Sequence, residues 1–282
     1  MEKSSDGTEP KEIKAYIYMT YENMLKVLAG GALKVRTIDG CNDPYEFMAA
    51  GPEGEKWSKE YEMAFICFSS LYNSGAMWGH YGDKHKGVCL EFTFPLRQPA
   101  FDLLNVAAEP SYYILDIELK EDSLISFSWR MPDKTHLYYC VLFNMKYEKE
   151  RQAFDYGMVG TSMMGGRLMC DVDKCLITKD KSWHYEEELR ILVPLPEKDV
   201  RKEEDYFVDC FHKYLTGIIL GIKCQKDAES VKKIVELFRK DGDGPIQVYQ
   251  AQYSEKTFDV LVPGIDKAPV RLPSLPVAMI QC

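Results

Sequence analysis

The sequence predicts an α+β fold, a single domain in which a mixed or antiparallel central sheet carries flanking helices. Two short and nearly continuous apolar runs, residues 63–70 and 87–94, are typical of buried strands. Residues 226–240 instead carry apolar side chains at helical spacing. The third observation is a compact strand–helix–strand pattern within residues 15–35. From these patterns we expect one sheet with helices packed against it.

The strand–helix–strand pattern begins with a strand at residues 15–20. Thr20 or Asn23 could cap the helix that follows, because a side-chain oxygen at that position accepts a bond from a free backbone N–H. The two glycines at positions 30–31 are expected to end the helix, since glycine tolerates the left-handed conformation of a C-terminal cap. Residues 32–35 then return as a strand.

The remaining elements follow from the same periodicities. Residues 42–46 contain Asn-Asp-Pro, which predicts a turn and the start of a helix. Apolar residues at helical spacing predict a long helix at 134–156, followed by a glycine-containing surface loop at 157–167. Further strands are expected at residues 111–119, 188–195, 216–222 and 246–261. In the late helix, the side chains expected to face the core are Val231, Ile234, Val235, Leu237 and Phe238.

No internal repeat or linker-like change in composition divides the chain, so we expect one domain at residues 15–265. Residues 1–14 are polar and predict a flexible leader that lacks the apolar stretch of a signal peptide. Residues 266–282 contain several prolines and predict an irregular tail. No apolar run approaches the roughly 20 residues that span a bilayer, so no membrane partner is expected.

Charge and cysteine usage exclude further classes. The formal net charge of −9 argues against nucleic acid as a partner, because duplex binding requires an electropositive face. The nine cysteines include no Cys-x-x-Cys pair, and their spacing therefore predicts no metal site. Most of the cysteines occur in apolar runs, which favours free thiols in a reducing compartment and hence a cytoplasmic protein.

A first polar segment, residues 77–87, lies between the two apolar strands. Its Trp78 and Tyr81 offer flat faces on which a base or a nicotinamide could stack while their polar tips reach water. His80 and His85 could contact the same ligand, because binding residues concentrate on loops held by a rigid scaffold. The alternative is structural: Trp78 and Tyr81 would cap the core, and the histidines would be solvated.

A second polar segment, residues 179–191, ends in a predicted strand. Because side chains alternate across a strand, Glu186, Glu188 and Arg190 would share one face. The guanidinium would keep a neighbouring carboxylate ionised and oriented, and that carboxylate could stabilise a developing cation or accept a proton. The alternative is a solvated strand face whose ion pair contributes little. The side chains expected on the core face are Leu189, Ile191 and Val193.

Several motifs of this chain occur together in one family. They are Tyr16 and Tyr18 in the opening strand, the stretch Asn42 to Glu46, Phe68-Ser69, Met77 to Gly87, Trp183 to Arg190, and the late strand Gly217 to Gly221. In this combination the chain resembles, over roughly residues 15–262, the largely bacterial family called domain of unknown function 2971. The resemblance implies a shared fold and brings little information about function.

The order of elements is also similar to that of mono-ADP-ribosyltransferase-like folds, at the level of fold analogy. This similarity implies a catalytic Glu188, accompanied by Glu186, on a late strand. A fixed carboxylate there would stabilise the oxocarbenium-like state of nicotinamide–ribose cleavage. The similarity also gives catalytic positions to Tyr18 and Tyr81, and it places Ser69 near the nicotinamide.

The same comparison implies how NAD would be held without any metal. Trp78 or Tyr81 would stack the nicotinamide, and Lys86, Arg190 or Arg36 would meet the diphosphate. The chain departs from that pattern in two respects: its first motif residue is tyrosine rather than histidine or arginine, and the insert at 95–180 is long.

Three functions remain open on these expectations, and the absence of P-loop, Gly-x-Gly-x-x-Gly, Gly-x-Ser-x-Gly and His-Glu-x-x-His motifs removes several others. The first is an NAD-dependent ADP-ribosyltransferase or NAD glycohydrolase, a toxin or anti-phage effector with a protein acceptor. The second is a non-catalytic ligand-sensing or partner-binding module for a nucleotide-type small molecule. The third is a hydrolase or nuclease that uses paired acids with a divalent ion. The catalytic hypothesis requires the loop near residue 80 and the strand near Glu188 to face each other across one cavity.

Overall fold

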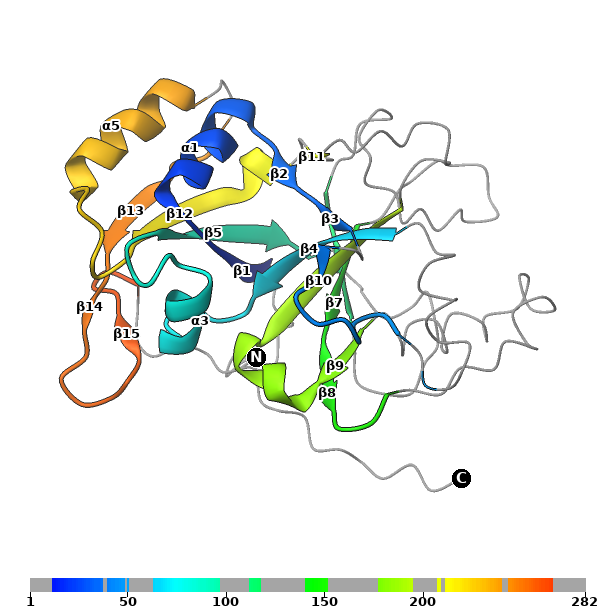
Figure 1. The fold of residues 1–282 in the computed structure, drawn as a ribbon. Helices are drawn as coiled ribbons and strands as arrows, with labels where there is room; N and C mark the ends of the chain where they lie inside the picture. The colour runs from blue at the N-terminus through cyan, green and yellow to red at the C-terminus, as the bar shows by residue number, and fades with distance from the viewer. Residues whose placement is uncertain are drawn as a thin grey trace, which may run out of the picture.

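The computed structural model describes residues 12–37, 40–48, 50, 63–96, 112–117, 140–151, 177–194, 207–208, 211–239 and 243–265. These residues form the predicted α+β fold, built on one mixed sheet with few helices (Figure 1). The proposed loop at 157–167 and the tail at 266–282 lie outside the described residues. So does the leader at 1–14, except that its last three residues belong to the first strand, which begins at Glu12.

The central sheet contains nine strands. They are β1 (Glu12–Met19), β3 (Arg36–Thr37), β4 (Met63–Ser69), β5 (Val88–Pro95), β6 (Tyr112–Leu115), β7 (Cys140–Asn144), β10 (Glu188–Pro194), β12 (Leu215–Leu220) and β13 (Gln247–Gln250). Their order is β13-β12-β5-β1-β4-β10-β7-β6, with β3 paired to β4 off this path. Every pair is antiparallel except β12 with β13, so the sheet is mixed.

Three two-stranded pairs accompany the central sheet. They are β2 (Leu33–Lys34) with β11 (Phe207–Val208), β8 (Lys146–Glu148) with β9 (Thr178–Asp180), and β14 (Gln252–Tyr253) with β15 (Val260–Leu261). The pair β8–β9 leads into the short 3₁₀ helix η3 (Lys181–Glu186), and a second 3₁₀ turn, η5 (Phe211–Tyr214), precedes β12. The hairpin β14–β15 extends from the body of the molecule below β13 (Figure 1).

Helices α1 (Tyr21–Gly30) and α5 (Ala228–Phe238) lie side by side on one face of the sheet (Figure 1). The caps of α1 are the predicted ones: the Thr20 side chain accepts a bond from the Asn23 N–H, and Gly31 ends the helix at φ 67°. The six-residue helix α3 (Gly75–His80) lies on the other face.

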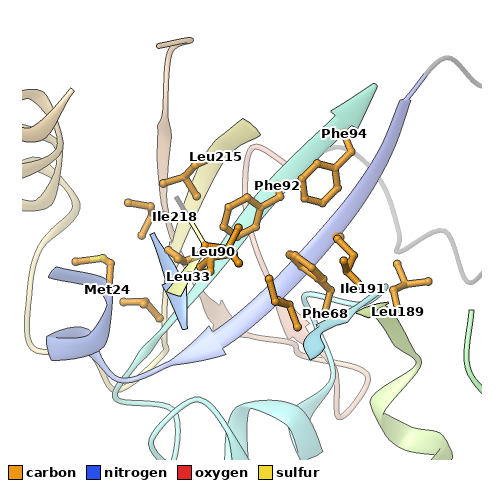
Figure 2. Packing of buried hydrophobic residues seen from close by; sticks show 14 of the residues in the cluster. Met24, Leu33, Phe68, Leu90, Phe92, Phe94, Leu189, Ile191, Leu215 and Ile218 are labelled. Atoms are coloured by element: carbon orange, nitrogen blue, oxygen red, sulfur yellow. The ribbon is translucent and has the colours of Figure 1, made fainter. Parts of the chain in front are cut away.

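The face beneath α1 and α5 carries the main hydrophobic core (Figure 2). Phe92 and Phe94 stack with ring centroids 5.9 Å apart, and Phe68 meets both rings edge-on. The predicted core residues Leu189 and Ile191 belong to this cluster. Alternation along β4, β5 and β10 therefore puts every second side chain into this core.

The opposite face carries a row of polar side chains across four adjacent strands. Glu91, Tyr16, Ser69 and Glu188 are successive cross-strand partners on β5, β1, β4 and β10. All four residues are buried. Since directly opposed residues share a face of the sheet, this register carries the polar groups toward α3 and η3.

The predicted helix at 134–156 is wrong in its described part, which forms strands β7 and β8. The run Cys140–Asn144 lies between β6 and β10. Its Leu142 and Phe143, neighbours on opposite faces of the strand, are both buried. A strand buried on both faces shows no period of two, so its apolar residues matched a helical spacing by coincidence.

Two smaller expectations also change. Helix α5 buries Val231 and Val235 as predicted, but Leu237 and Phe238 are 81% and 38% exposed. The stretch 42–46 forms a turn that continues to Phe47 and does not start an α-helix. The carboxylate of Asp43 accepts a bond from the Tyr45 N–H, which favours the turn locally over a helix.

The segment between α3 and β5 contains a left-handed turn, residues Gly82–Gly87. Asp83, Lys84 and His85 follow one another at φ 49°, 55° and 69°, a conformation unusual for residues other than glycine. The turn packs against Gly221, where a Cβ atom would lie 2.3 Å from the carbonyl oxygen of His85. Close packing of the backbone therefore requires glycine at position 221.

Gly221→Ala should lower the free energy of unfolding by roughly 1–3 kcal/mol, because the backbone must move to accept the methyl group. Gly79→Ala is the matched control, since nothing lies within 4 Å of a Cβ there. In helix α3 this control should stabilise slightly, by about 0.5–1 kcal/mol. Urea denaturation of both variants tests the difference. Equal stabilities would contradict the close contact at Gly221.

Candidate functional site

The centre of the candidate site is the guanidinium of Arg190, whose residue is only 1% exposed. Its Nε donates to Glu188 Oε1 at 2.7 Å, and its Nη2 donates to the same oxygen at 2.6 Å and to Glu46 Oε1. The rings of Phe47 and Phe65 lie 4.8 and 4.7 Å from the guanidinium carbon. The cation is thus held by two carboxylates and enclosed by aromatic rings.

Lys179, on β9, provides the second cation. Its Nζ lies 2.6 Å from Glu186 Oε2, 3.1 Å from Glu188 Oε2 and 3.8 Å from Glu46 Oε2. The ammonium also lies 5.0 Å from the centre of the Trp183 ring. We call the five buried charged residues Glu46, Lys179, Glu186, Glu188 and Arg190 the ion network.

Backbone geometry brings two acids of one segment into this network. Glu188 and Arg190 share a face of β10, as alternation predicted, whereas Glu186 lies in η3 rather than on the strand. Between them Glu187 adopts the left-handed conformation, with φ 42° and ψ 53°. Ser69 fixes this junction, because its hydroxyl donates to the Glu186 carbonyl at 2.7 Å.

Two tyrosines contact the network from other elements. The hydroxyl of Tyr81 donates to Glu186 Oε1 at 2.5 Å, so the two polar segments of the sequence do meet. Burial and the adjoining Glu186 carboxylate raise the pKa of Tyr81, which keeps this donor protonated at neutral pH. The hydroxyl of Tyr147 accepts the Glu188 N–H at 2.7 Å.

The cations determine the protonation state of Glu188. Burial alone would raise the pKa of its carboxyl, but Arg190 and Lys179 outweigh burial and lower that pKa below 4.5. The same carboxylates, with Glu188 and Glu46 foremost, raise the pKa of Arg190 against the effect of burial. Glu188 and Arg190 are therefore both ionised at neutral pH.

A groove of about 800 Å³ adjoins the network. We call it the η3 groove. It lies between η3, the start of α3, the left-handed turn and the hairpin β14–β15. Its ring-bearing wall residues are His85, His184, Tyr185, Tyr253 and Phe258. Its other wall residues are Leu71, Asn73, Ser74, Gly75, Ala76, Glu187, Ile222, Ser254, Thr257, Asp259 and Val260.

All four predicted catalytic residues lie outside this groove. Glu186, Glu188 and Tyr81 belong to the ion network and its contacts and do not line the groove. Tyr18 is buried and donates its hydroxyl to the Leu71 carbonyl at 2.7 Å. The two polar segments are adjacent, but the predicted acids do not face the cavity.

The predicted ligand-binding residues lie in different environments. Trp78 is fully buried and donates its Nε1–H to the Tyr72 carbonyl at 2.8 Å, so its faces are not open to a ligand. His85 lines the groove, and Lys86 is its exposed neighbour in the left-handed turn. His80 is exposed on α3, and its ring lies 5.7 Å from that of Tyr185.

The remaining predicted contact residues do not line the groove either. Ser69 is buried within the junction of β4 and η3. Arg190 cannot reach a diphosphate without leaving both of its carboxylates in the core. Arg36 is exposed on β3 and does not line the groove.

Sequence reasoning missed three charged residues of the site. Glu46 and Lys179 join the network from distant segments, and only the partners Arg190 and Glu188 reveal their role. Glu187 lines the groove, and the imidazole Nε2 of His184 lies 3.7 Å from its Oε1. A strand running through residues 185–193 would have turned Glu187 into the core, and the left-handed bend prevents this.

Comparisons with known proteins give a family match over part of the chain and no function. A family model described as protein of unknown function DUF2971 matches residues 77–191, which include Tyr81, Lys179 and the acids of η3 and β10. No curated protein and no solved structure matches the chain. The broader resemblance at residues 15–76 and 192–262, and the similarity to ADP-ribosyltransferase-like folds, therefore stay predictions.

The described residues also bear on metal sites, membrane spans and thiols. Within them, no group of three or more His, Cys, Asp or Glu residues is arranged to hold a metal ion. None of their helices has both the length and the apolar character needed to cross a membrane. Four cysteines of this part of the chain are free thiols: Cys41, Cys67, Cys89 and Cys224.

Arg190→Met should lower the free energy of unfolding by about 3–5 kcal/mol, because it leaves Glu46 and Glu188 buried without this cation. Lys232→Met is the control: Lys232 forms an exposed pair with Glu229, and its loss should change stability by at most about 0.5 kcal/mol. Chemical denaturation measures both. A loss below about 1 kcal/mol for Arg190→Met would show that the network does not hold the core together.

Acid should destabilise the wild-type protein partly through Glu188. A carboxylate whose pKa is lower in the folded state stabilises the fold above its unfolded pKa, and this contribution disappears as pH falls through the folded value. The loss from Glu188 should therefore appear below about pH 4.5. Unfolding free energies measured from pH 7 to pH 3 should fall less steeply in Glu188→Gln than in wild type. The exposed control Glu229→Gln should show the same dependence of unfolding free energy on pH as wild type. If Glu188→Gln also shows that dependence, Glu188 does not contribute to the destabilisation by acid.

Proposed function

We propose that the protein binds a nucleotide-type small molecule in the η3 groove and that binding, rather than catalysis by Glu188, is its function. The observation that carries this proposal is the composition of the groove wall. Aromatic or imidazole rings enter it from η3, the left-handed turn and the hairpin. Its volume of about 800 Å³ falls within the usual range of small-molecule sites, roughly 300–1,000 Å³.

Tyr185 is the best-placed ring for a base or a nicotinamide. Its ring centroid lies 6.1 Å from that of Trp183 and 5.7 Å from that of His80, so two neighbouring rings support its orientation. An aromatic ring held in place loses little entropy when a ligand stacks on it. Such stacking contributes about 1–3 kcal/mol per base.

The ion network supports binding indirectly. Lys179 and Tyr81 hold the Glu186 side chain, and Ser69 holds its carbonyl. Glu186 lies in sequence between Tyr185 and Glu187, which both line the groove. The buried charges thus position the backbone from which two wall residues project.

A second candidate, cleavage of NAD, is favoured by one observation: Glu187 is a groove-lining carboxylate held in a left-handed backbone conformation. Such conformations concentrate at functional sites. Glu187 could stabilise positive charge on the ribose as the C1′–N bond breaks and nicotinamide leaves with the bonding electrons. Water would attack C1′ and give ADP-ribose and a proton. On this reading Glu187, not Glu188, is the catalytic carboxylate.

The two candidates can be separated with NAD. Calorimetry should detect NAD binding, and Tyr185→Ala should weaken it about tenfold, equivalent to about 1.4 kcal/mol, because the stacking surface is lost. Tyr45→Ala removes a ring that is 62% exposed and outside the groove, and it should leave NAD affinity unchanged. If NAD, ADP and adenosine all fail to bind at millimolar concentration, the binding proposal is wrong.

Nicotinamide release measured on the same samples tests cleavage. Binding without release supports the first candidate. Release that disappears in Glu187→Gln and persists in Asp259→Asn, the other acidic wall residue, supports the second. Release lost in Glu188→Gln at unchanged stability would instead restore the original assignment to Glu188.

A further inference from the structure

Three exposed lysines gather at two neighbouring turns of this otherwise acidic chain, whose formal net charge is −9. Lys84 and Lys86 lie in the left-handed turn, and Lys223 lies in the turn that follows β12. Asp83 is the acidic residue of the first turn. We call Lys84, Lys86 and Lys223 the lysine group.

Backbone hydrogen bonds hold these two turns together. The N–H of Gly221 donates to the Gly87 carbonyl, and the N–H of Lys223 donates to the His85 carbonyl, each at 2.9 Å. Within the left-handed turn the Gly87 N–H donates to the Gly82 carbonyl at 2.9 Å. The Cα atoms of the lysine group therefore keep fixed relative positions, and only the side chains need to be ordered by a ligand.

The lysine group flanks the η3 groove. His85 lies between Lys84 and Lys86 and lines the groove, and so does Ile222, the residue before Lys223. Burial, followed by the charge of Lys223, lowers the pKa of His85. The three lysines thus adjoin, in sequence, two residues of the groove wall, although none of them lines the wall itself.

His85 itself has two features that the fold does not use. Among the residues the structure describes, its Nδ1 is the buried side-chain nitrogen or oxygen that lacks a hydrogen-bond partner. It also belongs to the run of three left-handed residues at 83–85. Buried polar atoms are normally paired, and strained backbone concentrates at ligand sites, so both features point to a ligand at this turn.

We propose that the lysine group and His85 bind the phosphate groups of the groove ligand, which is then a nucleoside diphosphate or a dinucleotide rather than a free nucleoside or base. This inference rests on the proposed binding function and assigns the two ends of the site. Tyr185 stacks on the base or nicotinamide of the ligand, and the two lysine-bearing turns bind its diphosphate. The charge-assisted bonds that ammonium groups make to phosphate oxygens supply the affinity at this end.

The test compares ADP, adenosine and inorganic pyrophosphate by calorimetry on the full chain. ADP should bind at least about tenfold more tightly than adenosine. Raising the salt concentration should weaken the binding of ADP more than the binding of adenosine. The triple variant Lys84→Gln, Lys86→Gln, Lys223→Gln should remove this difference and abolish pyrophosphate binding. The matched control is Lys26→Gln, Lys232→Gln, Lys233→Gln, which removes the same charge from exposed positions on α1 and α5. The control should bind all three probes as wild type does.

Failure of this inference is distinguishable from failure of the proposed function. If adenosine and ADP bind equally and the triple variant has no effect, the phosphate assignment is wrong and ring binding stands. If pyrophosphate binds through the lysine group but neither adenosine nor NAD depends on Tyr185, the anion site stands and the nucleotide proposal falls. If the control variant loses pyrophosphate affinity as strongly as the variant of the lysine group, net charge alone explains the loss. The lysine group is then not a binding site.

Discussion

The rest of the structure depends on the pairing of the buried Arg190 guanidinium with the carboxylates of Glu46 and Glu188. A charge that is 1% exposed must be paired, since an unpaired ion in the core costs several kcal/mol. Its partners come from two segments, Glu46 in the turn at 42–47 and Glu188 on β10. Lys179 brings in β9 and, through Glu186, the helix η3. The network therefore joins pieces of chain that are far apart in sequence, and it places them at one edge of the polar row.

The backbone at residues 185–188 decides which side chains enter the ion network and which line the η3 groove. Glu186 and Glu188 point into the network, and the residues between and before them, Glu187 and Tyr185, line the groove. The left-handed bend at Glu187 makes this possible, because a continuous strand would have placed 186 and 188 on one face and 185 and 187 on the core side. The acids predicted to be catalytic thus lie in the ion network, and their neighbours Tyr185 and Glu187 line the groove.

Much of the fold could be predicted because its signals are local. The cap at Thr20, the glycine at position 31, the apolar strands and the amphipathic α5 each depend on a few neighbouring residues, and all are present. The helix proposed at 134–156 failed for the opposite reason. Strand β7 is defined by its pairing with β6 and β10, and a strand buried on both faces has no period that distinguishes it from a helix.

The sequence by itself predicted that residues 77–87 and 179–191 meet, and that Glu188 and Arg190 share a face, and both features are present. The second prediction follows from the period of a strand. Only the tertiary structure decided which of those side chains are buried. Trp78 is in the core and Tyr185 is at the groove, although both are aromatic residues in polar segments. Burial depends on what long-range packing places over a side chain, and no local pattern encodes that.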